Sequence, residues 1–576
     1  MNYRYLAFIG SQDEASALER DLANSGMPLC FATGSMNLFI ARDTPWLPLP
    51  CGGAAIGRMF SRDGIRIRRP DQLGTHANPT ETRKYVVEHC WGEYLLIQPG
   101  SDGSNGVTVT RDPAPCGEFP CIYSLQGGLG FITSDISIPI DLNIYRKQID
   151  WETVAHCLAY PQIKTSRTGM AGVRELLSGT TLHIRGDDVQ AKQEWSPWDF
   201  VGSERRHTDP REAAAQVQHA VSLAVRTSAN AGNSILLELS GGLDSSIVGA
   251  CLRGTSARVV CCTLLAPVPG ADERHYAAQI AQLLGTPLHV ADLRLEEASF
   301  SFPLTAPVPT PKVGALQYAI DRTMQAVANR HGIESFFTGA GGDTVFSYLK
   351  TAAPAADALR EGGLKAGLAA IRDLSELHQC SLWTAGKLAI RKLRRHRSFE
   401  TPDRSFLAAG AISGPLEGHP WLDPPGSAFP GDVERIFGLA ASHMFRDSAP
   451  RGTTRHLRMP LLSQPVVEAC LRVPSWMWIA DGRNRAIARA AFTGVLPPDI
   501  LNRRSKGTFM SYVGAVYERD KRGMLDYLLT GRLRAHGLIE PASLRLYVEG
   551  NGPTRDRSFT RIFDLCMVEN WVRHHL

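Results

Sequence analysis

A glycine-rich turn at residues 240–246 constrains this chain more than any other feature of its sequence. The turn reads Ser-Gly-Gly-Leu-Asp-Ser-Ser, follows an apolar run at 235–239 that predicts a strand, and precedes a run at 247–252 that predicts a helix. A strand, a glycine turn and a helix N-terminus form an anion site, because glycine lets backbone N–H groups come close to the anion and the helix dipole favours negative charge. No Gly-Lys-[Ser/Thr] sequence follows, so the turn is not a Walker A loop.

The polar side chains of this turn indicate which anion it binds. Its serine hydroxyls add donors, and Asp244 suits a Mg²⁺ ion held against phosphate better than it suits bare phosphate. The turn resembles the pyrophosphate-binding loop of the ATP pyrophosphatases, enzymes that split ATP into AMP and pyrophosphate to activate a carbonyl or carboxylate group. The resemblance implies ATP and Mg²⁺ as ligands. The residues expected to contact ATP in this stretch are Leu239, Ser240, Gly241, Gly242, Asp244, Ser245 and Ser246.

Length and composition describe a globular protein of more than one domain. The 576 residues are 43% hydrophobic and 21% charged, which is ordinary for a folded enzyme. The net charge of +5 is small for this length and gives no reason to expect nucleic acid as a partner. No run approaches the roughly 20 apolar residues of a transmembrane helix, and the N-terminal apolar run is too short for a signal peptide. The twelve cysteines lack Cys-x-x-Cys spacing, so we expect reduced thiols and a cytoplasmic location.

The chain divides into a β-rich part and a part in which strands and helices alternate. Residues 1–200 hold short alternating runs between glycine and Asp/Asn turns, and the polar stretch 202–211 is typical of a linker. The strands expected most clearly are 94–98, 107–111, 122–126 and 130–135 in the first part and 259–265 and 335–338 in the second. The second part, 206–576, therefore predicts a parallel, doubly wound sheet. Ligands of such a sheet lie at the carboxyl ends of strands, where Ser240 and Gly339 both fall.

Two proline-rich stretches and one basic stretch complete this outline. Residues 303–311 and 414–431 resist regular structure and are expected as loops near the site. Residues 351–397 are rich in alanine and leucine and are expected to be helical. They end in a basic cluster formed by Arg391, Lys392, Arg394, Arg395 and Arg397. This cluster is interpreted either as a solvated helix face or as a contact for an acidic peptide or partner.

A second glycine-rich turn, Thr-Gly-Ala-Gly-Gly-Asp at 338–343, also follows an expected strand and ends in a carboxylate. Asp244 and Asp343 would then lie at two strand ends and could bind one Mg²⁺ ion between them, together with phosphate oxygens and water. We expect Gly339 to lie near the adenosine. Taken alone, the second turn would be interpreted as a structural turn in which Asp343 caps a helix, but the presence of the first turn favours a functional role.

A third motif, Arg-Arg-Ser-Lys-Gly at 503–507, offers positive charge next to a glycine. Such charge would stabilise departing pyrophosphate and a later oxyanion, and Lys506 is the expected catalytic residue. Upstream, Arg485 and Arg489 are expected on one helix face. Phosphate contact and plain solvation are both open for that pair, and we include Arg485 among the expected ATP contacts.

These motifs together resemble the asparagine synthetase superfamily over residues 210–515. The matching pieces are 240–246, Asp272-Glu273 before a helix ending at 284–285, 338–343, Arg-Met-Pro-Leu-Leu at 458–462, and 503–507. The N-terminal part, 1–200, resembles the glutaminase-type domain of that superfamily, a sandwich of two β-sheets between helices. The landmarks there are Trp-Gly-Glu-Tyr at 91–94, Arg-Asp-Pro at 111–113 and Phe-Ile-Thr-Ser-Asp at 131–135. The expected fold is thus an α/β/β/α sandwich followed by an α/β ATP-pyrophosphatase domain.

Departures from the superfamily pattern narrow the activity. Working glutaminases of this superfamily attack with a cysteine at position 2, where this chain has Asn2, and the nearest cysteine, Cys30, has no α-amino group to serve as base. Asparagine synthetases carry glutamate at the position of Ala340 and usually at that of Thr344, and β-lactam synthetases carry a catalytic tyrosine at the position of Ala340. Neither signature is present.

What remains resembles the lasso-peptide macrolactam cyclases. The shared segments are the Gly-x-Gly-Gly-Asp turn, His-Pro-Trp-Leu at 419–422, Leu-Leu-Ser-Gln-Pro at 461–465 and Ser-Lys-Gly at 505–507. The resemblance implies adenylation of an Asp or Glu side chain in a core peptide, ring closure by the N-terminal amine, and a leader peptidase and a leader-binding protein as partners. Two alternatives stay open: another amide ligase that makes a β-lactam or a free amide, and a catalytically dead scaffold that binds a peptide or a partner.

Overall fold

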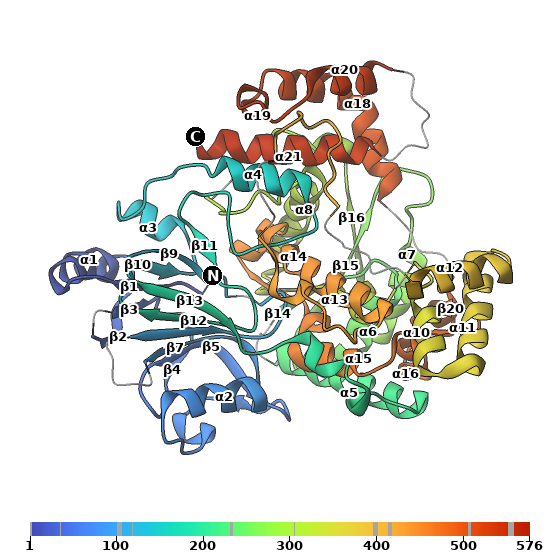
Figure 1. Ribbon diagram of the computed structural model, residues 1–576, viewed down its shortest axis with the longest axis horizontal. Coiled ribbons are helices and arrows are strands. Elements are labelled where there is room, and N and C mark those ends of the chain that lie inside the picture. The colour runs from blue at the N-terminus through green and yellow to red at the C-terminus, as the bar shows by residue number, and fades with distance from the viewer. Residues whose placement is uncertain are drawn as a thin grey trace.

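The computed structural model describes residues 3–34, 36–100, 106–117, 119–230, 234–304, 306–348, 350–394, 401–412, 417–504, 509–550 and 558–576. Figure 1 shows an N-terminal, sheet-rich region at the left and a larger α/β region that extends to the right and the top. All twelve cysteines lie in the described residues as free thiols. Among the described residues, no helix has the length and apolar character that crossing a membrane requires.

The N-terminal region contains two antiparallel sheets. The first has the strand order β11-β9-β10-β1-β3-β2, and the second has the order β13-β12-β8-β7-β5-β4, with β6 paired to β5. The strands are β1 Tyr5–Ile9, β2 Leu29–Thr33, β3 Met36–Ile40, β4 Trp46–Pro48, β5 Ala54–Ser61, β6 Arg66–Ile67, β7 Cys90–Pro99, β8 Val107–Arg111, β9 Ile122–Gln126, β10 Leu129–Thr133, β11 Arg174–Glu175, β12 Thr180–Arg185 and β13 Asp188–Gln193. The helices are α1 Gln12–Asn24, α2 Pro79–His89, α3 Ser137–Asp141 and α4 Trp151–Ala159.

Alternation along the strands explains why these sheets stack. In β1, Tyr5 and Ala7 share a core with Leu95 of β7, whereas Leu6 packs into a second core with Leu18 of α1. Successive side chains of a strand point to opposite faces, so one strand serves both cores. On the far side of the second sheet, α2 packs against β5 and β7. The order of layers is therefore helix, sheet, sheet, helix.

The α/β region is built on a five-stranded sheet with the order β16-β15-β14-β17-β18, in which all pairings are parallel. Its strands are β14 Ser234–Glu238, β15 Arg258–Leu265, β16 Leu288–Asp292, β17 Ser335–Phe337 and β18 His456–Arg458. The chain runs outward from β14 to β16 and then returns to add β17 and β18 on the other side of β14. The switch point of the sheet, where ligands bind in folds of this type, lies between β14 and β17.

Helices cover this sheet, and further helices lie at the right and at the top of the molecule. Those near the sheet are α5 Pro210–Ala229, α6 Leu243–Leu252, α7 Arg274–Leu283, α8 Ala315–His331, α9 Gly342–Val345, α13 Pro430–Ser442, α14 Met444–Asp447, α15 Gln464–Leu471, α16 Ala486–Ala491 and α17 Pro498–Asn502. At the right edge lie α10 Ala353–Glu361, α11 Gly363–His378 and α12 Leu382–Arg394 (Figure 1). At the top lie α18 Met510–Leu529, α19 Arg532–Ala535, α20 Pro541–Glu549 and α21 Phe559–His575, beside α4 (Figure 1).

The two regions are joined by buried polar contacts. Glu468 of α15 accepts hydrogen bonds from the Arg62 guanidinium at 2.8 Å and from the Trp195 ring N–H at 3.1 Å. The stretch expected as a linker is also anchored, because the buried Arg206 side chain pairs with Glu361 at 2.9 Å and with Asp432. Residues 202–211 are thus attached to the α/β region through the Arg206 side chain.

Candidate active site

The two glycine-rich turns meet at the carboxyl edge of β14 and β17. These strands pair in parallel, with Leu236 opposite Phe336. A Cβ atom at Gly339 would lie 2.5 Å from the backbone nitrogen of Ser245, and one at Gly342 would lie 2.4 Å from the Cβ of Asp244. Since such distances are not tolerated, only glycine lets the second turn lie this close to the start of α6. The glycines of 338–343 therefore set the spacing between the two carboxylates.

The serine side chains of the first turn form hydrogen bonds within the turn. Gly241 has φ +67°, a conformation that favours glycine, and Gly242 caps α6. The Ser240 hydroxyl accepts from the Gly242 N–H at 3.4 Å and shares a hydrogen bond of 3.1 Å with the Ser245 hydroxyl. Ser246 differs from these residues: its side chain is fully buried and its N–H donates to the Gly242 carbonyl at 3.2 Å. Of the expected contacts in this turn, Asp244, Ser245 and Ser246 all lie in α6, and Ser246 lies furthest into the helix.

Arg485 brings the two aspartates together. Its Nη1 donates to Asp343 Oδ1 at 3.0 Å and to Asp244 Oδ1 and Oδ2 at 3.1 and 3.2 Å. The guanidinium also lies over the Tyr348 ring, 5.0 Å from its centroid. Because both carboxylates reach one nitrogen, their oxygens are close enough to share a single cation. Asp244 and Asp343 therefore fit a Mg²⁺ ion that also takes phosphate oxygens and water.

The helix expected to carry Arg485 begins one residue later. Arg485 is the N-cap of α16 and has a left-handed backbone, φ +55°, which is uncommon for a side chain of this size and is found at functional sites. Arg489 lies within α16 and donates instead to the backbone carbonyls of Asn484, Leu501 and Arg503. Burial and the neighbouring Arg485 lower the pKa of Arg489 to about 10. Arg485 therefore lies in the site, whereas Arg489 holds the backbone at Asn484, Leu501 and Arg503.

Arg503 attaches the third motif to the first turn. Its Nη1 donates to the Gly241 carbonyl at 2.9 Å, and its Nη2 pairs with Glu273. The guanidinium also lies 4.1 Å from the centroid of the Tyr276 ring. Lys506, the expected catalytic residue of this motif, lies outside the described residues. The sequence marked Arg503 and Glu273 only as parts of motifs, because no local pattern reveals a contact between residues this far apart.

A cavity of about 530 Å³ opens beside these residues. Its lining includes the expected residues Leu239, Ser240, Asp244, Ser245, Gly339 and Asp343. The remainder of the wall is largely apolar, with Ile320, Met324 and Met459 among its side chains. A cavity with one polar edge and one apolar wall suits a nucleotide, whose base is apolar on its faces and whose phosphates are charged.

Ala340 and a buried ion cluster form two further parts of this wall. The Ala340 N–H donates to the Thr338 hydroxyl at 3.3 Å, and its methyl group offers no proton acceptor to the cavity. Arg451 pairs with Glu238 at 2.8 Å and with Asp321. Burial raises the pKa of both carboxyls, while the adjacent Arg451 lowers it. Sequence reasoning missed this cluster, because its members come from β14, α8 and a distant loop.

The segments predicted at 419–422, at 461–465 and in the proline-rich stretch lie in three different surroundings. His419 accepts from the Trp421 N–H at 3.0 Å through Nδ1, Trp421 is fully buried, and burial lowers the pKa of His419 to about 3, so this segment builds the core. Leu462 packs against the second turn, where a Cβ atom at Gly341 would lie 2.3 Å from its Cγ. In the proline-rich stretch, residues 303–304 and 306–310 line a separate cavity of about 670 Å³.

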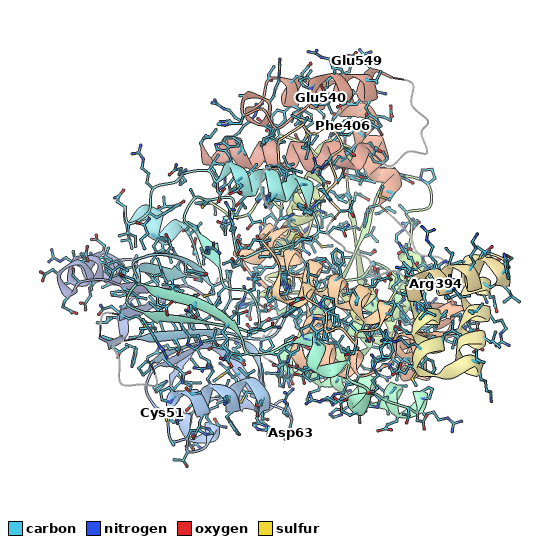
Figure 2. The ribbon with its side chains drawn as sticks, in the orientation of Figure 1. Cys51, Asp63, Arg394, Phe406, Glu540 and Glu549 are labelled. Atoms are coloured by element: carbon cyan, nitrogen blue, oxygen red, sulfur yellow. The ribbon has the colours of Figure 1, made fainter. Side chains whose placement is uncertain are left out.

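The basic stretch at the end of α12 lies away from this site. Lys392 pairs with Glu434, while Arg394 lies among the helices at the right of Figure 2. Arg395 and Arg397 lie outside the described residues. No described residue of this cluster lines the nucleotide cavity, so the structure does not decide between the two interpretations.

A parallel sheet with a serine-rich glycine turn and two carboxylates at its switch point defines an α/β nucleotide-binding protein. The chain belongs to the asparagine synthase family, whose model matches residues 216–573. No curated protein matches the chain. Among solved structures, the glutamine-dependent NAD+ synthetase from Acinetobacter baumannii in complex with adenosine diphosphate is similar at 11% identity and a TM-score of 0.20, over 61% of this chain and 77% of that chain. A TM-score this low carries no argument about this chain.

Proposed function

We propose that this chain is an AMP-forming, ATP-dependent amide ligase, and specifically a lasso-peptide cyclase. Its substrate would be a leader-free core peptide, in which the enzyme joins an Asp or Glu side-chain carboxylate to the N-terminal amine. Membership of the asparagine synthase family supports an ATP-dependent amide ligase. The observation that carries the finer proposal is Ala340 on the cavity wall, because its methyl group cannot do the work of the glutamate or tyrosine that asparagine and β-lactam synthetases carry at this position.

In the first step the peptide carboxylate attacks the α-phosphorus of ATP, and pyrophosphate leaves. The apolar wall near Leu239 and Met324 would hold the base, and the Ser240 and Ser245 side chains at the start of α6 would hold the phosphates. Mg²⁺, held by Asp244 and Asp343, would neutralise charge on the phosphate oxygens. Arg485 already lies between these carboxylates and would meet the charge that develops on departing pyrophosphate.

In the second step the peptide amine attacks the acyl-adenylate, and AMP leaves as the amide bond closes the ring. Amine and acyl group belong to one molecule, so a pocket that holds both makes the step unimolecular and removes much of its entropic barrier. We propose Lys506 as the residue that stabilises the oxyanion. Arg503 supports that role, because it fixes the chain three residues earlier against the Gly241 carbonyl.

The N-terminal region would serve structure or regulation in this proposal. It resembles a glutaminase domain, but Asn2 stands where the nucleophilic cysteine belongs. Cys30 lies in β2, its thiol donates to the Pro28 carbonyl at 3.5 Å, and burial raises its pKa, which makes it a poor nucleophile. Glu93 of the Trp-Gly-Glu-Tyr landmark pairs with Arg458 of β18, a contact between the two regions. A leader peptidase and a leader-binding protein would supply the substrate in a cytoplasmic pathway.

Incubation with MgATP and a synthetic core peptide tests this proposal. We expect AMP, pyrophosphate and a product lighter by one water that lacks a free N-terminal amine. Turnover of free aspartate with ammonia, or of a small β-amino acid, while every core peptide fails would favour the other amide ligases. No release of pyrophosphate with any of these substrates would favour a scaffold.

A further inference from the structure

A second cavity, of about 460 Å³, lies next to the nucleotide cavity. The start of α8, the end of α13, α14, α18 and α21 surround it. Its apolar side chains are half-buried, so part of each faces the cavity: Leu316, Met444, Val513, Phe563 and Met567. The proposed chemistry of ATP activation uses none of these residues.

The two cavities adjoin. Gln317, Phe445 and Ser448 line both of them. The two cavities therefore lie on either side of the same three side chains.

The size of the first cavity indicates that a peptide substrate needs space beyond it. Pockets of about 300–1,000 Å³ bury one drug-sized ligand. The nucleotide cavity, at about 530 Å³, lies in the lower half of that range and has to hold ATP. A cavity of this size that holds a nucleotide does not also hold a whole peptide.

The chemistry of the second cavity suits a peptide of varied sequence. Methionine side chains adapt to different apolar partners, and Met444 and Met567 both face the cavity. Polar groups for a peptide backbone are present as well. Lys312 lines the cavity and donates to the Pro161 carbonyl at 3.0 Å, and Asp564 lies in the same wall.

We propose that this second cavity binds the part of the substrate peptide that follows the activated Asp or Glu residue, the tail. The inference rests on the proposed function. The part that precedes the activated residue has to bend back, so that its amine reaches the acyl carbon inside the reaction chamber. The tail leads away from that carbon and therefore occupies the adjoining cavity.

A competing location for the tail is the cavity behind the proline-rich loop. That cavity is larger, about 670 Å³, but shares only Ala449 with the nucleotide cavity among their lining residues. The buried pair of Arg451 and Asp321 lies between them, with Arg451 in one lining and Asp321 in the other. This arrangement favours the cavity beside α21, and it makes the proline-rich cavity a matched control.

Cavity-filling variants test the inference. Ala441→Phe and Val513→Phe would fill the second cavity from two different helices, and Ala306→Phe would fill the control cavity. For a full core peptide, we expect either of the first two variants to raise KM about tenfold or more, since apolar contacts in a pocket are worth this much. KM for ATP should stay unchanged, as should KM for a peptide truncated directly after the acceptor residue. Ala306→Phe should change none of these values.

A crosslinking measurement with the unmodified protein supplies the second test. A core peptide with a photoreactive phenylalanine analogue in the tail should label the segment of α21 that contains Phe563 and Met567. If the wild type cyclises peptides but both filled variants keep a normal KM, or the label falls on residues 303–310, the inference is wrong and the proposed function stands. If the wild type closes no peptide at all, the proposed function fails and the inference fails with it.

Discussion

Replacement of Arg485 by methionine probes the site most sharply, because one side chain holds both aspartates. The expected loss in the free energy of unfolding follows from how far the three side chains are buried. The Arg485 and Asp244 side chains are 8% and 11% exposed, whereas that of Asp343 is 44% exposed. Breaking a buried ion pair by removing one partner costs about 3–5 kcal/mol, and an exposed pair is worth about 1 kcal/mol or less. Arg485→Met should therefore lower the free energy of unfolding by about 3 kcal/mol, nearly all of it from Asp244.

Magnesium ions should restore much of this loss. Without the guanidinium, Mg²⁺ has one competitor fewer for the two carboxylates, and a ligand that binds only the folded state stabilises it by mass action. Denaturant titrations with and without millimolar Mg²⁺ measure this. Arg489→Met is the matched control: it should lose stability because Arg489 donates to backbone carbonyls, but it leaves Arg485 between the aspartates, so Mg²⁺ should stabilise it no more than it stabilises the wild type. A loss below about 1 kcal/mol, or equal effects of Mg²⁺ on both variants, would refute the reasoning.

Four further predictions concern the two aspartates, Lys506, the N-terminal region and Asp357. Asp244→Asn or Asp343→Asn should abolish AMP formation while circular dichroism shows an intact fold, and normal turnover would contradict their assignment to the cation. Lys506→Ala should bind ATP normally but cyclise peptide on the order of a hundredfold more slowly, whereas a variant that only loses stability would make Lys506 structural. Purified protein should release no glutamate from glutamine, and release would overturn the interpretation of the N-terminal region. Burial and the adjacent Asp432 raise the pKa of Asp357 from 3.8 to about 8, so the folded chain binds this proton more tightly than the unfolded chain, and the free energy of unfolding should fall as pH rises from about 4 to about 8. Asp357→Asn should reduce this dependence of stability on pH in thermal melts recorded at several pH values. An unchanged pH dependence would contradict the role given to Asp357.

Local patterns were enough to predict the framework of this protein. The strand at 235–239, the glycine turn and the helix after it all follow from residues that are neighbours in the sequence, and the structure places β14, the turn and α6 there. The parallel sheet follows from the alternation of strands and helices. The meeting of Asp244 with Asp343 could also be expected, since both follow strands that end at one edge.

Contacts between distant residues could not be predicted in the same way. The pairing of Arg503 with Glu273 spans 230 residues, and that of Arg451 with Glu238 spans 213. No periodicity or spacing encodes such partners, because tertiary packing alone brings them together. Arg485 shows a related limit: helical spacing placed it beside Arg489, but its left-handed backbone turns it toward the aspartates.

The fate of the oxygen atoms of the substrate tests the central claim most directly. A core peptide whose acceptor Asp or Glu carboxylate carries oxygen-18 should be incubated with the enzyme and MgATP, and the products analysed by mass spectrometry. If the carboxylate attacks the α-phosphorus, one labelled oxygen leaves with AMP and the other stays in the new amide of the ring. Cyclic product formed with unlabelled AMP, or with the label in inorganic phosphate beside ADP, would contradict activation by adenylation in this site.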